Sequence, residues 1–262
     1  MSNASTLQLY FLNHESASGV ENMAADEALL ETLREVTETP LLVVRTYQWQ
    51  TPTWSLGVNQ KLKSLGELDI FLMGPTPQIV RRPTGGRAIL HDRDISFAFV
   101  TNDSTLLSLS LKESYCHFTQ FLKEALSVLT PLATDHCTAE NTSNSGYTRS
   151  NLCFETQTPG DLLDAAGNKI CGSAQLRRAG GILQHGAAFL PELPNTVAPV
   201  TTFRNALYKA VASHYKVKTL SFIEDSDTLY QRFQTLKAQL LPSYESASRD
   251  ILSKASITSG SQ

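Results

Sequence analysis

The sequence predicts an α+β fold in which a mixed, largely antiparallel β-sheet is flanked by helices. Short apolar runs with strand-like alternation recur along the chain, and residues 152–190 form a series of such runs separated by turns, as in a β-meander. Amphipathic helical segments lie before, between and after these runs, without regular strand–helix alternation. The 262 residues are enough for one large domain, or for a large domain with a small extension.

The N-terminal part of the chain contains two predicted helices among several predicted strands. Residues 21–34 are predicted to be helical because apolar side chains recur at helical spacing among alanines. Residues 106–129 have the same periodicity and form the longest predicted helix, which Pro131 follows. Residues 52–57 indicate a turn and a short extended piece. The predicted strands are residues 7–12, 41–47, 78–82 and 94–100.

The C-terminal part begins with a polar stretch rich in Gly, Ser, Asn and Thr, residues 135–150, which we expect to be a mobile loop. The meander follows this loop. Two amphipathic helices are then predicted, over residues 204–215 and 228–240. We expect the last residues, 257–262, to be disordered.

The composition is that of an ordinary globular protein, with 41% hydrophobic and 18% charged residues. The net charge of −3 gives no basic excess that would favour a nucleic-acid partner. No apolar run approaches the ~20 residues needed to span a bilayer, so we expect no membrane association. Because residues 1–6 are polar and lack the features of a secretion signal, we expect a cytoplasmic protein.

Cysteine spacing and missing signatures argue against several kinds of site. The four cysteines are widely spaced and include no Cys-x-x-Cys pair, so we expect free thiols and no metal site. The chain also lacks the Gly-x-x-x-x-Gly-Lys-Ser/Thr, Gly-x-Gly-x-x-Gly, Gly-x-Ser-x-Gly and His-Glu-x-x-His patterns. These absences argue against P-loop hydrolysis, Rossmann redox chemistry, α/β-hydrolase action and zinc hydrolysis, respectively.

The most distinctive segment is residues 81–92, Arg-Arg-Pro-Thr-Gly-Gly-Arg-Ala-Ile-Leu-His-Asp. Its adjacent glycines permit a positive φ and a close approach of the backbone to a ligand. His91 and Asp92 form either an orienting pair for acid–base chemistry or a turn with a capping aspartate. The arginines here and at residues 177–178 are either solvated surface or contacts for an anionic ligand.

Cys153 and Lys169 are the candidates for chemistry. Taken alone, Cys153 between Leu and Phe reads as a small buried hydrophobic residue, and Lys169 as an exposed strand residue. The residues between them read as one loop and one hairpin turn, which can bring the strand from Lys169 alongside the cysteine. A neighbouring ammonium favours the thiolate, which is the nucleophilic form of cysteine.

Two segments of the meander are candidates for ligand contact. Residues 172–175, Gly-Ser-Ala-Gln, would let a ligand lie against the backbone, or would form a tightly packed strand. Residues 184–186, Gln-His-Gly, end the meander and bring an imidazole toward the same place, although a lone histidine also has structural roles.

Four segments, in this order along the chain, resemble the biotin/lipoate protein ligase superfamily (lipoate-protein ligase A-like). Within it they resemble the cysteine-dependent octanoyltransferases of lipoate biosynthesis. The segments are residues 22–30 (Asn-Met-Ala-Ala-Asp-Glu-Ala-Leu-Leu), 81–92, 153–155 (Cys-Phe-Glu), and 169–175 together with 184–186. The resemblance implies the catalytic-domain fold of that superfamily over residues 1–220, with its core at about 38–220. Residues 221–262 would then be a helical extension that ends in the disordered tail.

Two positions favour the transferase branch. ATP-dependent lipoate ligases typically have a third glycine where this chain has Arg87, and they lack a cysteine that matches Cys153. Many also carry a further C-terminal domain, for which the residues after Tyr215 are too few. The chain departs from the transferase pattern near the loop before Cys153, which lacks the usual proline, and in the longer turn before Lys169.

The resemblance implies a two-step acyl transfer with Cys153 and Lys169 as catalytic residues. Cys153 would take an octanoyl group from octanoyl-acyl carrier protein. It would then pass the group to a lysine of a lipoyl-domain protein, such as the glycine-cleavage H protein, without ATP. The arginines around Arg82 and Arg178 would attract the acidic carrier protein. The implied substrate-binding residues are Arg82, Thr84, Gly85, Gly86, His91, Gly172, Ser173, Ala174, Gln175, His185 and Gly186.

Three other functions are consistent with the same motifs. One is an ATP-dependent lipoate-protein ligase, which would need ATP and Mg and in which Lys169 would contact an acyl-adenylate. Another is an amidotransferase that moves octanoyl groups between lipoyl domains. A non-catalytic acyl-binding module would need neither Cys153 nor Lys169.

Overall fold

A seven-stranded mixed sheet forms the centre of the protein, of which the computed structural model describes residues 6–13, 16–36, 38–61, 78–132, 153, 160–190 and 197–259. The strand order is β10-β1-β2-β6-β9-β8-β7. The pairs among the first three strands in this order are parallel, and the remaining pairs are antiparallel. The sheet confirms the predicted α+β class, and β7, β8 and β9 form the predicted meander. The strands are β1 (Gln8–Asn13), β2 (Leu41–Tyr47), β6 (Ile95–Thr101), β7 (Leu162–Leu163), β8 (Lys169–Arg178), β9 (Gly181–Ala188) and β10 (Ser221–Phe222).

A separate three-stranded sheet has the order β4-β3-β5. Its strands are β3 (Thr53–Leu56), β4 (Gln78–Arg81) and β5 (Ile89–His91). Strands β3 and β4 agree with predicted extended segments. The sequence did not predict β5 or β10, because segments of three and two residues are too short to show a period-two pattern.

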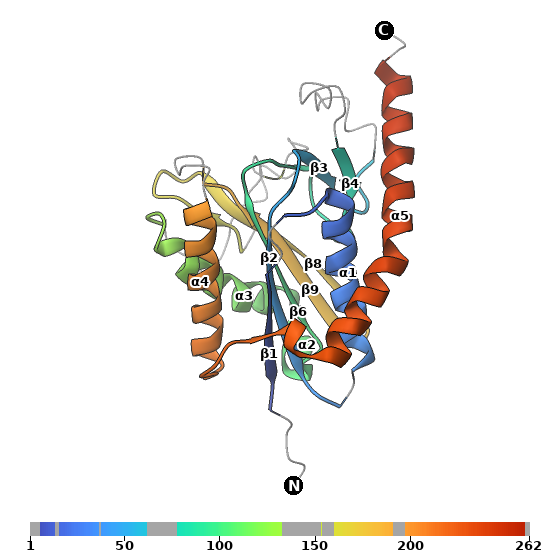
Figure 1. Cartoon of the computed structure of the whole chain (residues 1–262). Coiled ribbons are helices and arrows are strands. Elements are labelled where there is room, and N and C mark those ends of the chain that lie inside the picture. The colour runs from blue at the N-terminus through green and yellow to red at the C-terminus, as the bar shows by residue number, and fades with distance from the viewer. Residues whose placement is uncertain are drawn as a thin grey trace.

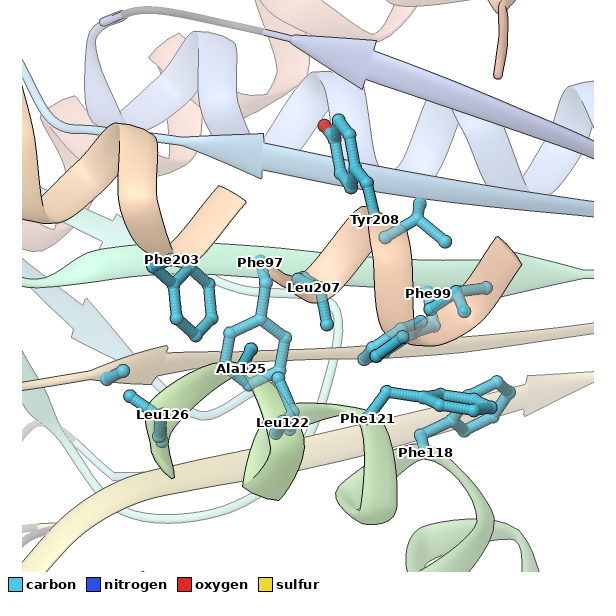
Figure 2. Close-up of a cluster of buried hydrophobic side chains, with 14 of the residues drawn as sticks. Phe97, Phe99, Phe118, Phe121, Leu122, Ala125, Leu126, Phe203, Leu207 and Tyr208 are labelled. Carbon is cyan, nitrogen blue, oxygen red and sulfur yellow. The ribbon is translucent and has the colours of Figure 1, made fainter. Parts of the chain in front are cut away.

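Four long helices cover the two faces of the large sheet (Figure 1). Helices α1 (Gly19–Glu35) and α5 (Asp227–Ser259) pack on one face, and α3 (Leu111–Ser127) and α4 (Val197–His214) pack on the other. The core beneath α3 and α4 is aromatic, and Figure 2 shows Phe99 of β6 against Phe118 of α3. Their ring centroids are 4.9 Å apart. Each buried side chain of this size stabilises the fold by about 1.5–3 kcal/mol.

The predicted helix over residues 106–129 is in fact two helices, α2 (Ser104–Ser108) and α3. The hydroxyl of Ser110 accepts a hydrogen bond from the backbone N–H of Glu113, whose carboxylate accepts one from the N–H of Ser110. This capping box starts a new helix. The apolar periodicity continues through both helices and so predicted one, although the Ser-x-x-Glu pattern was a signal for the break.

Helix α5 continues well beyond the segment predicted for it. Tyr244 is buried in the core that contains α1, and Ile251 is buried against the small sheet. The prediction of disorder is wrong for residues 257–259, which are helical, because a helix propagates readily from a turn that tertiary packing already holds. Residues 260–262 lie outside the described residues.

Two sequence predictions are not tested by this fold. The polar loop over residues 135–150 lies outside the described residues. The division into a domain over residues 1–220 and an extension over 221–262 stays a prediction. In the described ranges, no helix has both the length and the apolar character that a membrane span requires.

Candidate active site

Most of the predicted site residues meet in one pocket, which both sheets and α1 line. Its empty volume, including the open mouth, is about 460 Å³. The predicted site residues that line it are Arg82, Gly86, His91, Cys153, Gly172, Ser173, Ala174, His185 and Gly186. The lining residues that the sequence did not single out are Met23, Tyr47, Ser55, Ile89 and Ala187.

Cys153 lies beside Lys169, as the turn pattern predicted. The Nζ atom of Lys169 is 3.6 Å from the Sγ atom of Cys153 and donates a hydrogen bond of 3.1 Å to the backbone oxygen of the same residue. The predicted free thiols are confirmed for Cys116, Cys153 and Cys171. The pair therefore places the cationic nitrogen of Lys169 next to the sulfur of Cys153, which lines the pocket.

Cys153 and Lys169 are held in place by different sheets. The N–H of Cys153 donates a hydrogen bond of 2.8 Å to the oxygen of Ala88, just before β5. Lys169 begins β8 in the large sheet, and its side chain runs past Gly172 on the same strand. A Cβ atom at Gly172 would lie only 2.6 Å from Cε of Lys169, so the glycine makes room for the lysine.

Asp161 is the third member of this cluster, and the sequence reasoning missed it. Its Oδ2 atom is 2.8 Å from Nζ of Lys169, and both side chains are only 3% exposed. Asp161 precedes β7, which pairs with the start of β8, so it faces the first residue of β8. The available signal was an acidic residue directly before an apolar strand.

The electrostatics keep Lys169 charged. Burial lowers the pKa of Lys169, but the charges of Cys153 and Asp161 and the hydrogen bond to Asp161 outweigh burial, and the net pKa is raised. A lysine with a raised pKa keeps its proton at neutral pH. The site therefore holds a permanent cation next to sulfur, which is the arrangement that favours a thiolate.

Arg82 organises the loop with the two glycines. Its guanidinium donates to the carbonyl oxygens of Ser55, Gly85 and Arg87 at 2.7–3.1 Å. The loop needs a glycine at position 86, where φ is +94° and a Cβ atom would lie 2.8 Å from Nη2 of Arg82. The positive-φ prediction thus holds for Gly86.

The role of the arginines around Arg82 and Arg178 in attracting an acidic carrier protein stays a prediction. Arg82 is 6% exposed, and its hydrogen bonds go to backbone carbonyls. Arg178 forms ion pairs with Glu27 and Glu31 of α1. Of these two arginines, Arg178 therefore has acidic partners, whereas Arg82 is buried against backbone carbonyls.

A buried polar network lies behind the pocket. Nδ1 of His185 is 2.7 Å from Oδ2 of Asp26, and Nε2 is 2.7 Å from the hydroxyl of Thr84. Asp26 also accepts hydrogen bonds from Arg45 and Tyr47. Burial raises the pKa of Asp26, but Arg45 and His185 outweigh it and lower the pKa overall. This network ties α1 to β2 and β9, and its sequence signal was a charged residue among the apolar positions of the segment 22–30.

The pair His91–Asp92 is not an orienting pair. Nδ1 of His91 is 2.9 Å from Oδ2 of Asp94, whereas Asp92 is exposed and lies 3.6 Å from Arg93. The ring of His91 stacks on Trp49, with centroids 3.9 Å apart. The structure therefore supplies the carboxylate two residues later than the sequence pattern suggested, because β5 ends at His91 and the chain turns there.

Four predicted residues are not among those that line the pocket, and one of them, Lys169, contacts the lining residue Cys153. Thr84 holds His185, and Gly85 contributes its carbonyl to Arg82. The amide of Gln175 bonds with Gln184 and with Ser114 of α3, away from the pocket. Across the described ranges, no group of three or more His, Cys, Asp and Glu side chains is arranged to hold a metal ion.

Comparison with known proteins places these residues in a family. Residues 18–217 match the family model "Lipoyl protein ligase A/B catalytic domain". An octanoyltransferase LipM of Carboxydothermus hydrogenoformans is 39% identical over 179 residues, which are 68% of this chain and 63% of that protein. The LipM of Geobacillus kaustophilus is 32% identical over 81% of this chain and 80% of its own length.

The fold comparison agrees with the sequence comparison. Protein Ta0514 of T. acidophilum has a TM-score of 0.63 over 92% of this chain and 96% of its own, at 21% identity, so it shows the shared fold alone. The chain spans less than two thirds of the length of the Carboxydothermus relative. Because the family model covers most of the chain and the Geobacillus relative extends over four fifths of its length, the chain belongs to the lipoyl protein ligase A/B catalytic-domain family.

Proposed function

We propose that this protein is an octanoyltransferase of lipoate biosynthesis, with Cys153 as the acyl carrier. The observation that carries the proposal is the 3.6 Å distance between the ammonium of Lys169 and the sulfur of Cys153, which lines the pocket. The relatives named octanoyltransferase LipM support it. An acyl-binding module has no need of a nucleophile next to a buried cation.

In the first step, the thiolate of Cys153 attacks the thioester of octanoyl-acyl carrier protein. A bond forms between Sγ and the acyl carbon, and the carrier leaves as a thiol after taking up a proton. Thioester exchange of this kind is nearly neutral in free energy. The charged Lys169 stabilises the thiolate before attack and lies close enough to bind the carbonyl oxygen as it becomes negative.

In the second step, a lysine of a lipoyl-domain protein, such as the glycine-cleavage H protein, attacks the acyl-enzyme. The C–S bond breaks and an amide forms, which is downhill from a thioester. The donor is already activated, so the reaction needs no ATP. Two steps let two large protein partners use one pocket in turn.

We expect the acyl chain to lie in the pocket, where Met23, Ile89, Ala174 and Ala187 contribute apolar surface. Each buried CH₂ contributes about 0.8 kcal/mol to binding. We place the reaction in the cytoplasm, since a catalytic thiol must stay reduced.

The test is intact-mass spectrometry of the protein after incubation with octanoyl-acyl carrier protein and no ATP. We expect one octanoyl adduct, which disappears when a lipoyl domain is added. Cys153→Ala and Cys153→Ser should abolish the adduct, whereas Cys116→Ala, a matched free cysteine on α3, should keep it.

Other outcomes would identify the alternatives. Acyl transfer that requires octanoate and ATP would show a ligase. Loading from an octanoylated lipoyl domain, but not from the acyl carrier protein, would show an amidotransferase.

A further inference from the structure

The second step of the proposed reaction needs a group that accepts a proton. The attacking nitrogen of the acceptor lysine must lose a proton when it becomes an amide. Lys169 is unsuited to accept it, because the ammonium is paired with Asp161 at 2.8 Å and its raised pKa keeps it protonated. Another base in the pocket must therefore serve the acceptor.

Two histidines line the pocket, and only one has a ring nitrogen left for a substrate. Both nitrogens of His185 are engaged, Nδ1 with Asp26 and Nε2 with Thr84. His91 uses Nδ1 for Asp94, and its Nε2 has no hydrogen-bond partner among the residues that the structure describes.

The surroundings of His91 hold it in one orientation. The carboxylate of Asp94 also accepts a hydrogen bond of 2.8 Å from Ser96, and Ser96 accepts one of 2.9 Å from Nε1 of Trp49. The ring of Trp49 stacks on the imidazole at 3.9 Å. A carboxylate at Nδ1 favours the tautomer with its proton on Nδ1, which leaves the lone pair on Nε2.

We propose that His91 is the general base of the amide-forming step and that Asp94 is its positioning residue. The inference rests on the proposed function and assigns a further residue of that site. The neutral amine of the acceptor forms a bond to the acyl carbon, and Nε2 of His91 takes a proton from the attacking nitrogen. The C–S bond breaks, and its electron pair stays on Cys153 next to the ammonium of Lys169. The imidazolium then returns its proton to solvent.

The test separates the two steps on enzyme that has been loaded with octanoate and purified. Discharge is measured at saturating lipoyl domain and, separately, with hydroxylamine, a small nucleophile that is neutral at pH 7 and needs little help from a base. For His91→Gln we expect discharge to the lipoyl domain to slow roughly 100-fold, far more than loading slows, while discharge to hydroxylamine stays near normal. Asp94→Asn should show the same pattern with a smaller loss, and the exposed Asp92→Asn is the matched control with no loss.

Several results would overturn the inference. An equal loss with hydroxylamine and with the lipoyl domain would show that His91 stabilises the oxyanion or the fold. A change in the half-saturating concentration of the lipoyl domain alone would show that it binds the acceptor. If His91→Gln does not fold, normal discharge by Asp94→Asn would contradict the proposal. Absence of any adduct on the unmodified protein would instead disprove the octanoyltransferase function.

Discussion

Asp161 and Lys169 form a buried ion pair, with 2.8 Å between Oδ2 and Nζ, and this pair holds the lysine at the sulfur of Cys153. Lys169 begins β8, and Asp161 directly precedes the neighbouring strand β7. Since Lys169 has one fixed anionic partner, it can attract a second, transient negative charge at the sulfur or at the acyl oxygen without losing its position.

Removing the cation should make Cys153 less reactive. We expect Lys169→Met to slow alkylation of Cys153 by iodoacetamide at pH 7 by at least about ten-fold, equivalent to about 1.4 kcal/mol. The half-buried Cys116 on α3 provides an internal control when alkylation is followed residue by residue by mass spectrometry. Unchanged alkylation of Cys153 would refute the electrostatic role of the lysine.

Substitutions at Asp161 and Lys169 should have non-additive effects on the free energy of unfolding. Removing one partner leaves a buried charge, so Asp161→Leu and Lys169→Met should each lower the free energy of unfolding by about 3–5 kcal/mol. The double variant should lose less than the sum, because no unpaired charge remains. Urea unfolding of the four proteins gives the coupling energy, and additive losses would show that the two side chains do not interact.

Gly172 should affect the rate of octanoyl loading through the position of the Lys169 side chain. A Cβ atom at the glycine would displace Cε and Nζ of the lysine, which is the movable end of a side chain. We therefore expect Gly172→Ala to slow octanoyl loading by roughly 10- to 100-fold. In a protein that already carries Lys169→Met, Gly172→Ala should not slow loading further. A further decrease in the loading rate would show that Gly172 does not act through Lys169.

Substitution of the two adjacent glycines of the loop by alanine should have different effects on stability. Gly86 has φ of +94° and lies against Arg82, so Gly86→Ala should destabilise the protein by about 1–2 kcal/mol and slow loading. A methyl group at Gly85 would meet no atom of the described residues within 4 Å, so Gly85→Ala should change stability by less than about 0.5 kcal/mol. Thermal unfolding measures the stability of both variants. An equal loss of stability in the two variants would contradict the prediction.

Stability should fall in weak acid because of His117 on α3. Burial, and to a lesser degree the charge of His214, lowers the pKa of His117 to about 4 from 6.5. Between pH 4 and pH 6.5, His117 therefore binds more protons in the unfolded chain than in the folded protein. The free energy of unfolding is highest above pH 6.5 with respect to this group, and it decreases as the pH falls toward 4.

For this partly exposed group we expect a loss of about 1–2 kcal/mol after allowance for solvent screening. His117→Gln, whose amide can still reach Tyr215, should show a flatter profile in urea unfolding at pH 7.5 and 4.5. Parallel profiles of the two proteins would exclude His117 as the cause.

Local patterns were sufficient for most elements of the fold. Apolar periodicity located α1, β2 and β6, since these segments bury one face or both and their side chains repeat at the period of the backbone. The same periodicity could not show that α2 and α3 are separate, because the break depends on one capping box. It also could not show that α5 continues to Ser259, because packing against α1 and the small sheet, rather than local pattern, holds that helix.

The amino-acid sequence by itself determined the α+β class and the motifs that identify the family, and its turn pattern permitted Cys153 to lie beside Lys169. Only the tertiary structure decided which side chains share the pocket, that Asp161 holds the lysine, that Asp94 rather than Asp92 holds His91, and that Arg82 serves the loop. These contacts join strands and helices distant along the chain, and their partners are chosen by sheet register and burial, which no short stretch of sequence encodes.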